Sequence, residues 1–471
     1  MYFGTYSISG MRILFFVILS GLFSQGFSQH SCQEIKSSFA NGGHLFRSGE
    51  EAKRSDTVNV LNYSVNLDFT KATLDSLIGN CQVKFESLMD INSITLDLLQ
   101  MDIDSITHDG STISYVYNDT TIVAYFPTTI SASEIDSLTV FYRGAPQTDA
   151  SGLGGFYFSG GYYFNLGVGL AADPHNYGRV WHPCFDNFVE RATYDFSVLT
   201  SNGNTAYCNG SRISETTVGT DSLLTNWKMN TEIPTYLASV AVSDYEHVEQ
   251  NFYSTLQDTD FPVWLAANEA DTSNFKASFT NLIPLLEEFE DHFGPYNWER
   301  VGYVLVPFNS GALEHATNIA YPQITANGTL TYEFLMAHEL AHSWWGNWVT
   351  CETAEEMWIN EGLARYCEFL FYEYLYNYES YIEAMRNKHH HVLHRAHIDD
   401  GGFHALNNVP TEFTYGIHSY DKGADVMHTL RSYMGDAKFY EGLKYIQTNF
   451  GGGNISSEEF MDALNSISGV D

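Results

Sequence analysis

Apolar and polar residues alternate along most of the first half of the chain. Between residues 55 and 247, apolar side chains recur at every second position, which is the period of a half-buried β-strand. The clearest runs are Leu61, Tyr63, Val65, Leu67 and Phe69; Cys81, Val83 and Phe85; Ile94, Leu96 and Leu98; and Leu138, Val140 and Tyr142. Asp109-Gly110, Asn202-Gly203 and Asn209-Gly210 are steps typical of hairpin turns. The pattern predicts an antiparallel β domain over residues 55–247, with an irregular loop over the glycine- and tyrosine-rich residues 151–169.

The apolar spacing changes to a helical period after about residue 250. Ser273 is placed to cap a helix whose apolar face ends at Phe293. Pro284 is expected to kink this helix or split it, and Gly294 to end it. Residues 301–306 fit a buried strand, and the chain from Thr331 onward is mostly helical in pattern. We therefore predict a multidomain α+β fold, with a mainly α-helical domain over residues 248–471.

The N-terminus has the pattern of a secretory signal peptide. Arg12 supplies a positive charge, residues 13–23 are apolar, and Gly26 and Ser28 are the small residues expected before a cleavage site. The apolar stretch is shorter than the ~20 residues needed to span a bilayer, so no transmembrane segment is predicted. Residues 1–28 are interpreted as a signal peptide, with Met11 as an alternative start, and residues 29–54 as a polar leader. A secreted or cell-envelope location follows.

Composition narrows the partners. The 471 residues include 22 Lys and Arg against 57 Asp and Glu, a formal net charge of −35. Nucleic acid needs a basic surface, so it is excluded as a partner, and anionic membranes are disfavoured. Hydrophobic residues make up 44% of the chain, enough to build real cores. The six cysteines are widely spaced without a C-x-x-C pair, and we assign no disulfide pairing.

The sharpest chemical signal is the sequence His338-Glu339-Leu340-Ala341-His342. Two histidines at positions i and i+4 lie one above the other on a helix face, close enough to bind one metal ion. Glu339 is adjacent in sequence to the first ligand, so its carboxylate reaches the open coordination position of the metal. This arrangement predicts a general base beside a metal site.

Glu361 is a candidate for the third ligand. Eighteen residues lie between it and His342. A second helix packed on the first would present this carboxylate to the same ion. Two His, one Glu and one water make the open tetrahedral site of a catalytic zinc, whereas structural sites have four protein ligands. The surrounding tryptophans make the segment apolar, and buried His and Glu need partners.

Four stretches resemble the zinc aminopeptidases of the aminopeptidase N type, a family that includes the bifunctional leukotriene hydrolases. The resemblance is carried by residues 338–368 (HELAHSWWGNWVTCETAEEMWINEGLARYCE), residues 293–298 (FGPYNW), residues 179–196 with their HPCFD sequence, and residues 419–423 (SYDKG). It extends from about residue 55 to the C-terminus. It implies an N-terminal β domain followed by a thermolysin-like, mainly α-helical catalytic domain.

The resemblance also implies roles for single residues. His338, His342 and Glu361 look like the ligands of one zinc ion per chain, and Glu339 looks like the general base. Tyr420 looks like the phenol that stabilises the tetrahedral oxyanion, a role that suits an O–H donor placed where charge develops.

The G-x-M-E-N motif of the family has an altered form here, Gly311-Ala312-Leu313-Glu314-His315. Glu314 is expected to pair with the α-ammonium group of the substrate, which makes the enzyme an exopeptidase. Gly311 and Ala312 have small side chains or none, so an extended substrate is expected to lie close to the backbone there. His315 replaces the usual Asn and is expected to alter how the substrate backbone is held.

Two further features depart from the family pattern or stand outside it. Asp173 is a candidate substitute, shifted by one residue, for a family side chain that helps to hold the amine. Residues 388–397 are rich in histidine, which fits either a solvated patch, the interpretation we favour, or a second metal site or pH-sensitive lid. The chain also stops where the family's catalytic helices would continue, so we expect the catalytic domain to be incomplete at its C-terminus.

These observations predict a zinc-dependent aminopeptidase that removes N-terminal residues from peptides by attack of a zinc-bound water, with Glu339 as general base. Its partners would be peptides with a free N-terminus, and its oligomeric state is not predicted. Alternatives are a thermolysin-like endopeptidase, an epoxide hydrolase, and a catalytically decayed surface binding protein on the same fold. The residues give the epoxide hydrolase no independent support, and the intact ligands, base and Tyr420 argue against decay.

Overall fold

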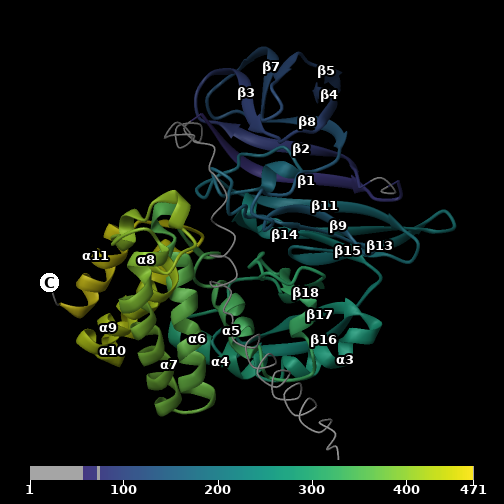
Figure 1. The fold of residues 1–471 in the computed structure, drawn as a ribbon. Helices are drawn as coiled ribbons and strands as arrows, with labels where there is room; N and C mark the ends of the chain where they lie inside the picture. Colours follow the sequence, from purple (N-terminus) through teal and green to yellow (C-terminus); the bar gives the residue numbers. More distant parts are fainter. Residues whose placement is uncertain (1–56, 72–74, 470–471) are drawn as a thin grey trace, which may run out of the picture.

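A computed structural model describes residues 57–71 and 75–469. The predicted signal peptide and leader, residues 1–54, lie outside the described residues. Within the described part of the chain, no helix combines the length and apolar character needed to cross a bilayer. Figure 1 shows a β-rich N-terminal half stacked against a half that holds most of the helices.

The N-terminal half contains three sheets. An eight-stranded sheet has the order β13 (Ser211–Val218), β14 (Ser222–Pro234), β11 (Arg191–Ser201), β1 (Val58–Asp68), β2 (Leu77–Ser87), β8 (Ile135–Gly144), β4 (Asp102–His108), β5 (Ser111–Thr112). A three-stranded sheet has the order β3 (Ile91–Asp97), β7 (Thr121–Ile130), β6 (Tyr115–Tyr117). A four-stranded sheet has the order β12 (Thr205–Cys208), β15 (Val240–Ser243), β10 (Tyr162–Leu166), β9 (Gly155–Ser159). All their neighbouring strands are antiparallel except β1 and β11, which are parallel.

Alternation predicts the strand interiors well, with one local exception in β1. Tyr63, Val65 and Leu67 are buried as expected, but Leu61 is only half-buried and Val60 takes its place in the core. The register against β2 shifts between Val60 and Asn62, which marks a β-bulge. Because a bulge inserts one residue, it reverses the face that each side chain occupies on either side of it.

Three sequence predictions are wrong in this half. Residues 151–169 are not an irregular loop throughout, because β9 and β10 pair as a hairpin around Gly160 and Gly161, both with positive φ. Of the three predicted hairpin turns, only Asp109-Gly110 is confirmed, because it connects the antiparallel strands β4 and β5. Asn202-Gly203 and Asn209-Gly210 instead connect strands that belong to different sheets, so they are turns but not hairpin turns.

The C-terminal half has a four-stranded mixed sheet and a group of helices. The sheet has the order β16 (Tyr245–Ser254), β17 (Thr259–Asn268), β18 (Val301–Val306), β19 (Ile319–Pro322), and β20 (Val349–Cys351) pairs separately with β21 (Gly453–Ile455). The helices are α3 (Glu269–Ser278), α4 (Leu282–Phe293), α5 (Glu333–Ala341), α6 (Leu363–Leu375), α7 (Tyr378–His391), α8 (His397–Asp399), α9 (Gly423–Met434), α10 (Asp436–Phe450) and α11 (Ser457–Ser468). The buried strand predicted over residues 301–306 is confirmed as β18, as is the helical character from Thr331 onward.

Strands β16 and β17 have no counterpart in the prediction, which expects helical spacing after residue 250. The helix predicted to start at Ser273 begins earlier, at Glu269, and the chain breaks it into α3 and α4. The break precedes Pro284, which occupies the third position of α4, where a helix lacks a partner for the backbone N–H anyway. Gly294 ends α4 with φ of 101°, as predicted. Sheets change at Asp244, between β15 and β16, close to the predicted domain limit.

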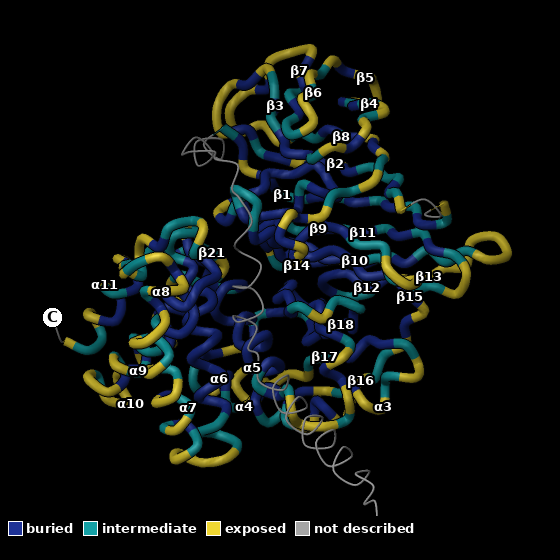
Figure 2. Tube along the Cα trace, viewed as in Figure 1, coloured by how far each residue is buried: buried dark blue, intermediate teal, exposed yellow. Residues whose placement is uncertain are grey.

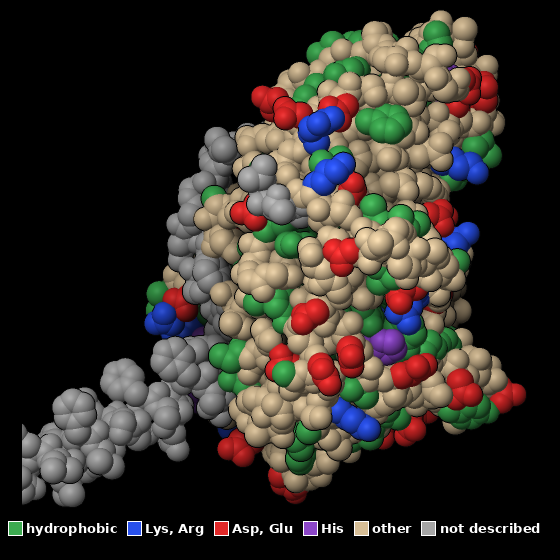
Figure 3. Space-filling view, turned by 90° about the vertical axis from the view of Figure 1, so that its right-hand side faces the viewer, with side chains coloured by type: hydrophobic (Ala, Val, Ile, Leu, Met, Phe, Trp, Pro, Cys, Tyr) green, Lys and Arg blue, Asp and Glu red, His purple; other side chains and the backbone are tan. Residues whose placement is uncertain are grey.

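Helices α5 and α6 lie in the interior of the C-terminal half. Figure 2 shows these helices buried along most of their length, while α7 and α10 expose one side. The acidic side chains are spread over the molecular surface visible in Figure 3 and outnumber the basic ones there. Among the described residues all five cysteines are free and buried: Cys81, Cys184, Cys208, Cys351 and Cys367.

Candidate metal centre

The two histidines of the H-E-x-x-H sequence lie at the C-terminal end of α5. His338 is in the last turn of the helix and His342 directly follows it, still in helical conformation. Both are fully buried, and their Nε2 atoms are 3.1 Å apart. The predicted i, i+4 geometry is confirmed, because one turn of helix brings both rings to the same point.

Glu361 joins them from a second segment. It lies in a π-helical turn, η6 (Trp358–Gly362), that leads directly into α6. Its Oε2 is 3.2 Å from Nε2 of His338 and 3.4 Å from Nε2 of His342. Zinc bonds of about 2.0–2.1 Å at tetrahedral angles hold ligand atoms about 3.3 Å apart, so the three atoms have the spacing of one zinc site.

The charge of the donor set also fits a cation. Burial lowers the pKa of His338, but hydrogen bonds to Glu361 and Glu368 overcome this effect and raise it to about 10. His342 likewise has a raised pKa despite burial, because Glu314 and Glu361 are close. The carboxylates therefore hold protons on the imidazoles that a metal ion would displace.

Contacts on the outer side of each ring orient the two histidines. Nδ1 of His342 lies 2.9 Å from the carbonyl oxygen of Trp345, which only accepts, so Nδ1 carries the proton and Nε2 faces the site. Nδ1 of His338 lies 2.9 Å from Oε1 of Glu368. Such outer carboxylates fix the tautomer and raise the basicity of a metal-binding imidazole. A Cβ on Gly346 would lie 3.0 Å from Nδ1 of His342, so glycine makes room for this ring.

Glu339 and Tyr420 line the same site. Glu339 is fully buried on α5 between the two histidines. Tyr420 is also fully buried, in a second π-helical turn, η10 (His418–Lys422), and its ring stacks on His338 with centroids 6.0 Å apart and planes at 11°. The structure therefore brings the predicted base and the predicted phenol to the metal ligands.

A pair of glycines sets how closely the two π-helical turns approach. A Cβ added to Gly362 would lie 2.8 Å from the carbonyl oxygen of Ser419 and 2.9 Å from Cα of Gly423. A Cβ on Gly423 would meet Cα of Gly362 at 2.9 Å. Larger residues at either position would push the two turns apart and separate Glu361 from Tyr420. This explains why a glycine stands at the end of the turn that holds Glu361 and directly after the turn that holds Tyr420.

Glu314 reaches the site from the loop before β19. One of its carboxylate oxygens lies within 4.8 Å of an oxygen of Glu339 and a ring nitrogen of His342. The side chain is buried, and its Oε2 has no hydrogen-bond partner among the described residues. Gly311, with φ of 150°, and Ala312 precede it, and Leu313 forms a two-hydrogen-bond bridge with Ala320 of β19.

His315 contacts the N-terminal half. Its Nε2 accepts a hydrogen bond of 3.3 Å from the backbone N–H of Gly167. Burial lowers the pKa of His315 to about 3, so the ring is neutral and able to accept. The replacement of the usual Asn therefore gives the motif a contact between the two halves. The proposed amine contact of Asp173 remains a prediction.

The histidine-rich run contacts acidic side chains, and none of its histidines belongs to a candidate metal cluster among the described residues. His389 pairs with Asp425 at 2.6 Å and His391 with Asp421 at 2.7 Å, while His390 and His394 stack. The second metal site and the pH-sensitive lid stay predictions, and the contact of His391 draws attention to Asp421.

Asp421 is the centre of a buried ionic network that the sequence analysis did not find. Its Oδ1 accepts a hydrogen bond of 2.9 Å from Nε of Arg365, whose Nη1 donates to Glu368, the carboxylate beside His338. Glu368 follows Glu361 by seven residues, which places both near one face of a helix, and this spacing is the signal that would have found it. The network links the segment of Tyr420 to the metal ligand.

Replacing Asp421 by Asn should lower the free energy of unfolding by about 3 kcal/mol at neutral pH, because it leaves the buried Arg365 without this charge partner. Burial alone would raise the pKa of Asp421, but Arg365, His391 and Lys388 hold it well below its ordinary 3.8. A depressed pKa stabilises the fold above pH 3.8, and this contribution is lost as pH falls toward the folded-state pKa. The deficit of Asp421→Asn should therefore narrow below that pH in thermal unfolding of the metal-free protein. A deficit that stays constant with pH would contradict the assignment.

Comparison with known proteins identifies the family of the chain. The Peptidase M1 N-terminal domain profile matches residues 59–237, and the Peptidase family M1 domain profile matches residues 277–471. The chain belongs to peptidase family M1. Among relatives of this M1 chain, endoplasmic reticulum aminopeptidase 1 of Homo sapiens is 26% identical over 312 residues, covering 62% of this chain and 32% of that protein. Glutamyl aminopeptidase of Rattus norvegicus is 28% identical over 309 residues, covering 61% and 31%. The matches thus span about a third of each relative.

A solved structure has a fold similar to that of this M1 chain. An M1 zinc metallopeptidase mutant from Deinococcus radiodurans, bound to a Tyr-Ser-Ala substrate, superposes with a TM-score of 0.78 at 21% identity. The match covers 88% of this M1 chain and 92% of that one. It confirms the predicted order of a β-rich N-terminal domain and a helical catalytic domain.

Proposed function

We propose that this M1 protein is a zinc-dependent aminopeptidase that binds one zinc ion per chain through His338, His342 and Glu361. The observation that carries the proposal is the buried carboxylate of Glu314 beside the metal ligands, with one oxygen free of any hydrogen bond among the described residues. A buried carboxylate oxygen without a donor is costly, and a substrate ammonium group would supply both donor and opposite charge.

The bound zinc ion would lower the pKa of water and polarise the scissile carbonyl. Glu339, placed between the two histidine ligands, takes the proton from the attacking water and returns it to the leaving amine. Tyr420 donates its O–H to the oxygen on which negative charge develops. Glu314 holds the substrate α-ammonium, so the bond presented to this centre is the first peptide bond.

The endopeptidase alternative is less well supported because it gives Glu314 no role. A cleft that accepts chain on both sides of the scissile bond has no use for a buried acid at the amine end. The decayed binding protein is disfavoured because the three ligands, the base and the phenol all converge. No contact in the site favours an epoxide substrate.

Hydrolysis of aminoacyl-p-nitroanilides tests the proposal. The zinc-loaded protein should cleave substrates with a free amine at least about 100-fold faster than their N-acetylated forms, because acetylation removes the charge that Glu314 binds. A chelator should abolish cleavage and added zinc should restore it. Equal cleavage of blocked substrates would favour the endopeptidase, and activity that resists the chelator would exclude a metal mechanism.

We also propose export, on the sequence of residues 12–29 alone. An exported enzyme would act on peptides outside the cytoplasm. Fractionation of producing cells, with N-terminal sequencing of the mature chain, tests this proposal separately from the activity.

A further inference from the structure

A turn of the N-terminal half is seated against the loop that carries Glu314. We call residues 311–318 the Glu314 loop. The side-chain Nδ2 of Asn209 donates a hydrogen bond of 2.6 Å to the carbonyl oxygen of Ala316. The backbone N–H of Gly210 donates one of 2.6 Å to Oγ1 of Thr317. Two successive residues of one half therefore hold two successive residues of the other.

Thr317 is held in an unfavourable backbone conformation at this contact. Its φ is +59°, in the left-handed region that a β-branched residue rarely adopts. A Cβ added to Gly302 of β18 would lie 2.1 Å from the carbonyl oxygen of Thr317, so the catalytic domain presses closely on the same residue. Such a conformation persists only where its surroundings enforce it.

The Asn209-Gly210 turn is itself firmly fixed. Asn209 is fully buried, and it also donates to the carbonyl oxygen of Leu237 at 2.8 Å and accepts from the backbone N–H of Ser239. Arg300 of the catalytic domain donates from Nε to the carbonyl oxygen of Gly210 at 3.0 Å. A Cβ on Gly210 would lie 2.0 Å from the carbonyl oxygen of Lys228, so only glycine fits there.

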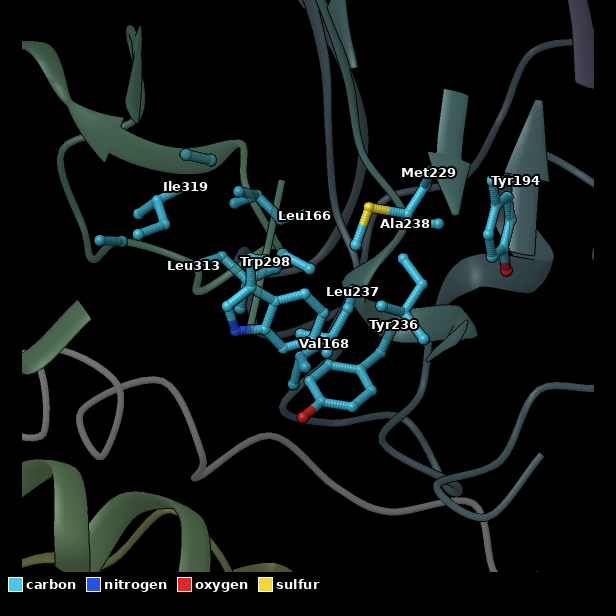
Figure 4. Packing of buried hydrophobic residues seen from close by; sticks show 14 of the residues in the cluster. Leu166, Val168, Tyr194, Met229, Tyr236, Leu237, Ala238, Trp298, Leu313 and Ile319 are labelled. Carbon is cyan, nitrogen blue, oxygen red and sulfur yellow. The ribbon is translucent and has the colours of Figure 1, made fainter. Parts of the chain in front are cut away.

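Apolar packing on both sides of the Glu314 loop completes the support. Leu313 and Ile319, which flank the loop's polar contacts, belong to the same buried apolar cluster as Leu166 and Leu237 of the N-terminal half (Figure 4). Asn318 donates to the carbonyl oxygen of Tyr207 at 3.2 Å and to the hydroxyl of Ser239 at 3.0 Å. The loop is thus attached along its length to a surface that belongs to the other domain.

We propose that Asn209 is a positioning residue for Glu314. Its hydrogen bond to Ala316 offsets the steric penalty at Thr317 and holds the loop in the conformation that aims Glu314 at the metal centre. Without that bond, the loop would populate other backbone states and the carboxylate would leave the ammonium position part of the time. This inference rests on the proposed ammonium-binding role of Glu314.

Asn165 provides a matched control. It is also a fully buried Asn of the N-terminal half, and it donates to the carbonyl oxygen of Ala238 at 2.8 Å and accepts from the N–H of Val240 at 2.9 Å. It therefore supports the same segment as Asn209, but its side chain makes no hydrogen bond to the Glu314 loop among the described residues. Asn165→Ala and Asn209→Ala should lower the melting temperature by similar amounts, since each leaves buried backbone groups unsatisfied.

The decisive measurement is inhibition by an amino acid hydroxamate compared with its N-acetyl form, using the zinc-loaded full chain. The ratio of the two inhibition constants isolates the ammonium contact, because both compounds bind the metal through the same group. Asn209→Ala should reduce this ratio about tenfold, and Asn165→Ala should leave it unchanged.

The outcomes separate the two proposals. A wild-type ratio near one would refute the ammonium role of Glu314, and the inference would fall with it. A large wild-type ratio that Asn209→Ala leaves intact would overturn the inference alone. If Asn209→Ala does not fold, Asn209→Ser keeps a shorter hydrogen-bonding group, and it should still reduce the ratio while Asn165→Ser does not.

Discussion

Replacing Glu339 by Gln should lower kcat about 10²- to 10⁴-fold while leaving the zinc content unchanged. Gln has the same shape as Glu but takes no proton, so the attacking water loses its base and the leaving amine loses its acid. Glu339 lies on α5 between His338 and His342 in the sequence. The three atoms whose separations fit one zinc ion belong to His338, His342 and Glu361, and none belongs to Glu339. The measurement is turnover of an aminoacyl-p-nitroanilide together with metal analysis by mass spectrometry.

Glu333→Gln is a suitable control for that experiment. Glu333 is the first residue of the same helix and is also buried, but it accepts hydrogen bonds from Asn281 and Tyr376, away from the metal ligands. Its variant should keep kcat within about twofold, since nothing in the site contacts it. Loss of zinc from Glu339→Gln would show that Glu339 is a ligand, and the assignment of Glu361 as third ligand would then need revision.

Replacing Glu314 by Ala should reduce kcat/KM about 100-fold, through both a higher KM and a lower kcat, again with zinc retained. Under the proposed function, the ammonium contact would exist in the ground state and would also orient the first peptide bond, so both constants should change. The preference for free over N-acetylated substrates should shrink in the same variant. Steady-state kinetics on the paired substrates measure both effects, with Glu333→Gln as the reference.

If Glu314→Ala kept the full preference for free amines, the ammonium would be bound elsewhere. Asp173 is the residue that the sequence offers for that role. An unchanged preference in Glu314→Ala that disappears in Asp173→Ala would move the amine site to the N-terminal half.

The metal centre was largely readable from the sequence because its geometry is local. His338 and His342 are one helical turn apart, so their convergence follows from the helix alone. Glu361 and Tyr420 converge through tertiary packing. The distance of Glu361 from His342 along the sequence indicates a candidate third ligand, whereas only the resemblance to a family indicates a role for Tyr420. Their π-helical turns have no sequence signature that periodicity detects. The spacing of seven residues from Glu361 could have indicated Glu368. The hydrogen bond of Asn209 to Ala316 could not be predicted, because it joins segments far apart in the chain.

The errors in the fold have equally specific causes. Strand β16 exposes much of its surface at the edge of a sheet and lacks a regular apolar alternation, so its pattern did not indicate a strand. In β9 and β10, aromatic residues occupy successive positions on both faces, which hides the period of two. Strand β18 was easier to predict, because its six residues, five apolar and one glycine, are all buried.

The two π-helical turns have a consequence for insertions and deletions. A π-helical turn is an α-helix that holds one extra residue, and each residue turns an α-helix by about 100°. Deleting one residue from the turn that holds Glu361 would let it relax to a regular helix and rotate the carboxylate away from the histidines. The same deletion around Tyr420 would remove the phenol from its place on His338. The length of each turn, counted to a single residue, is therefore as essential to this centre as the identity of its ligands.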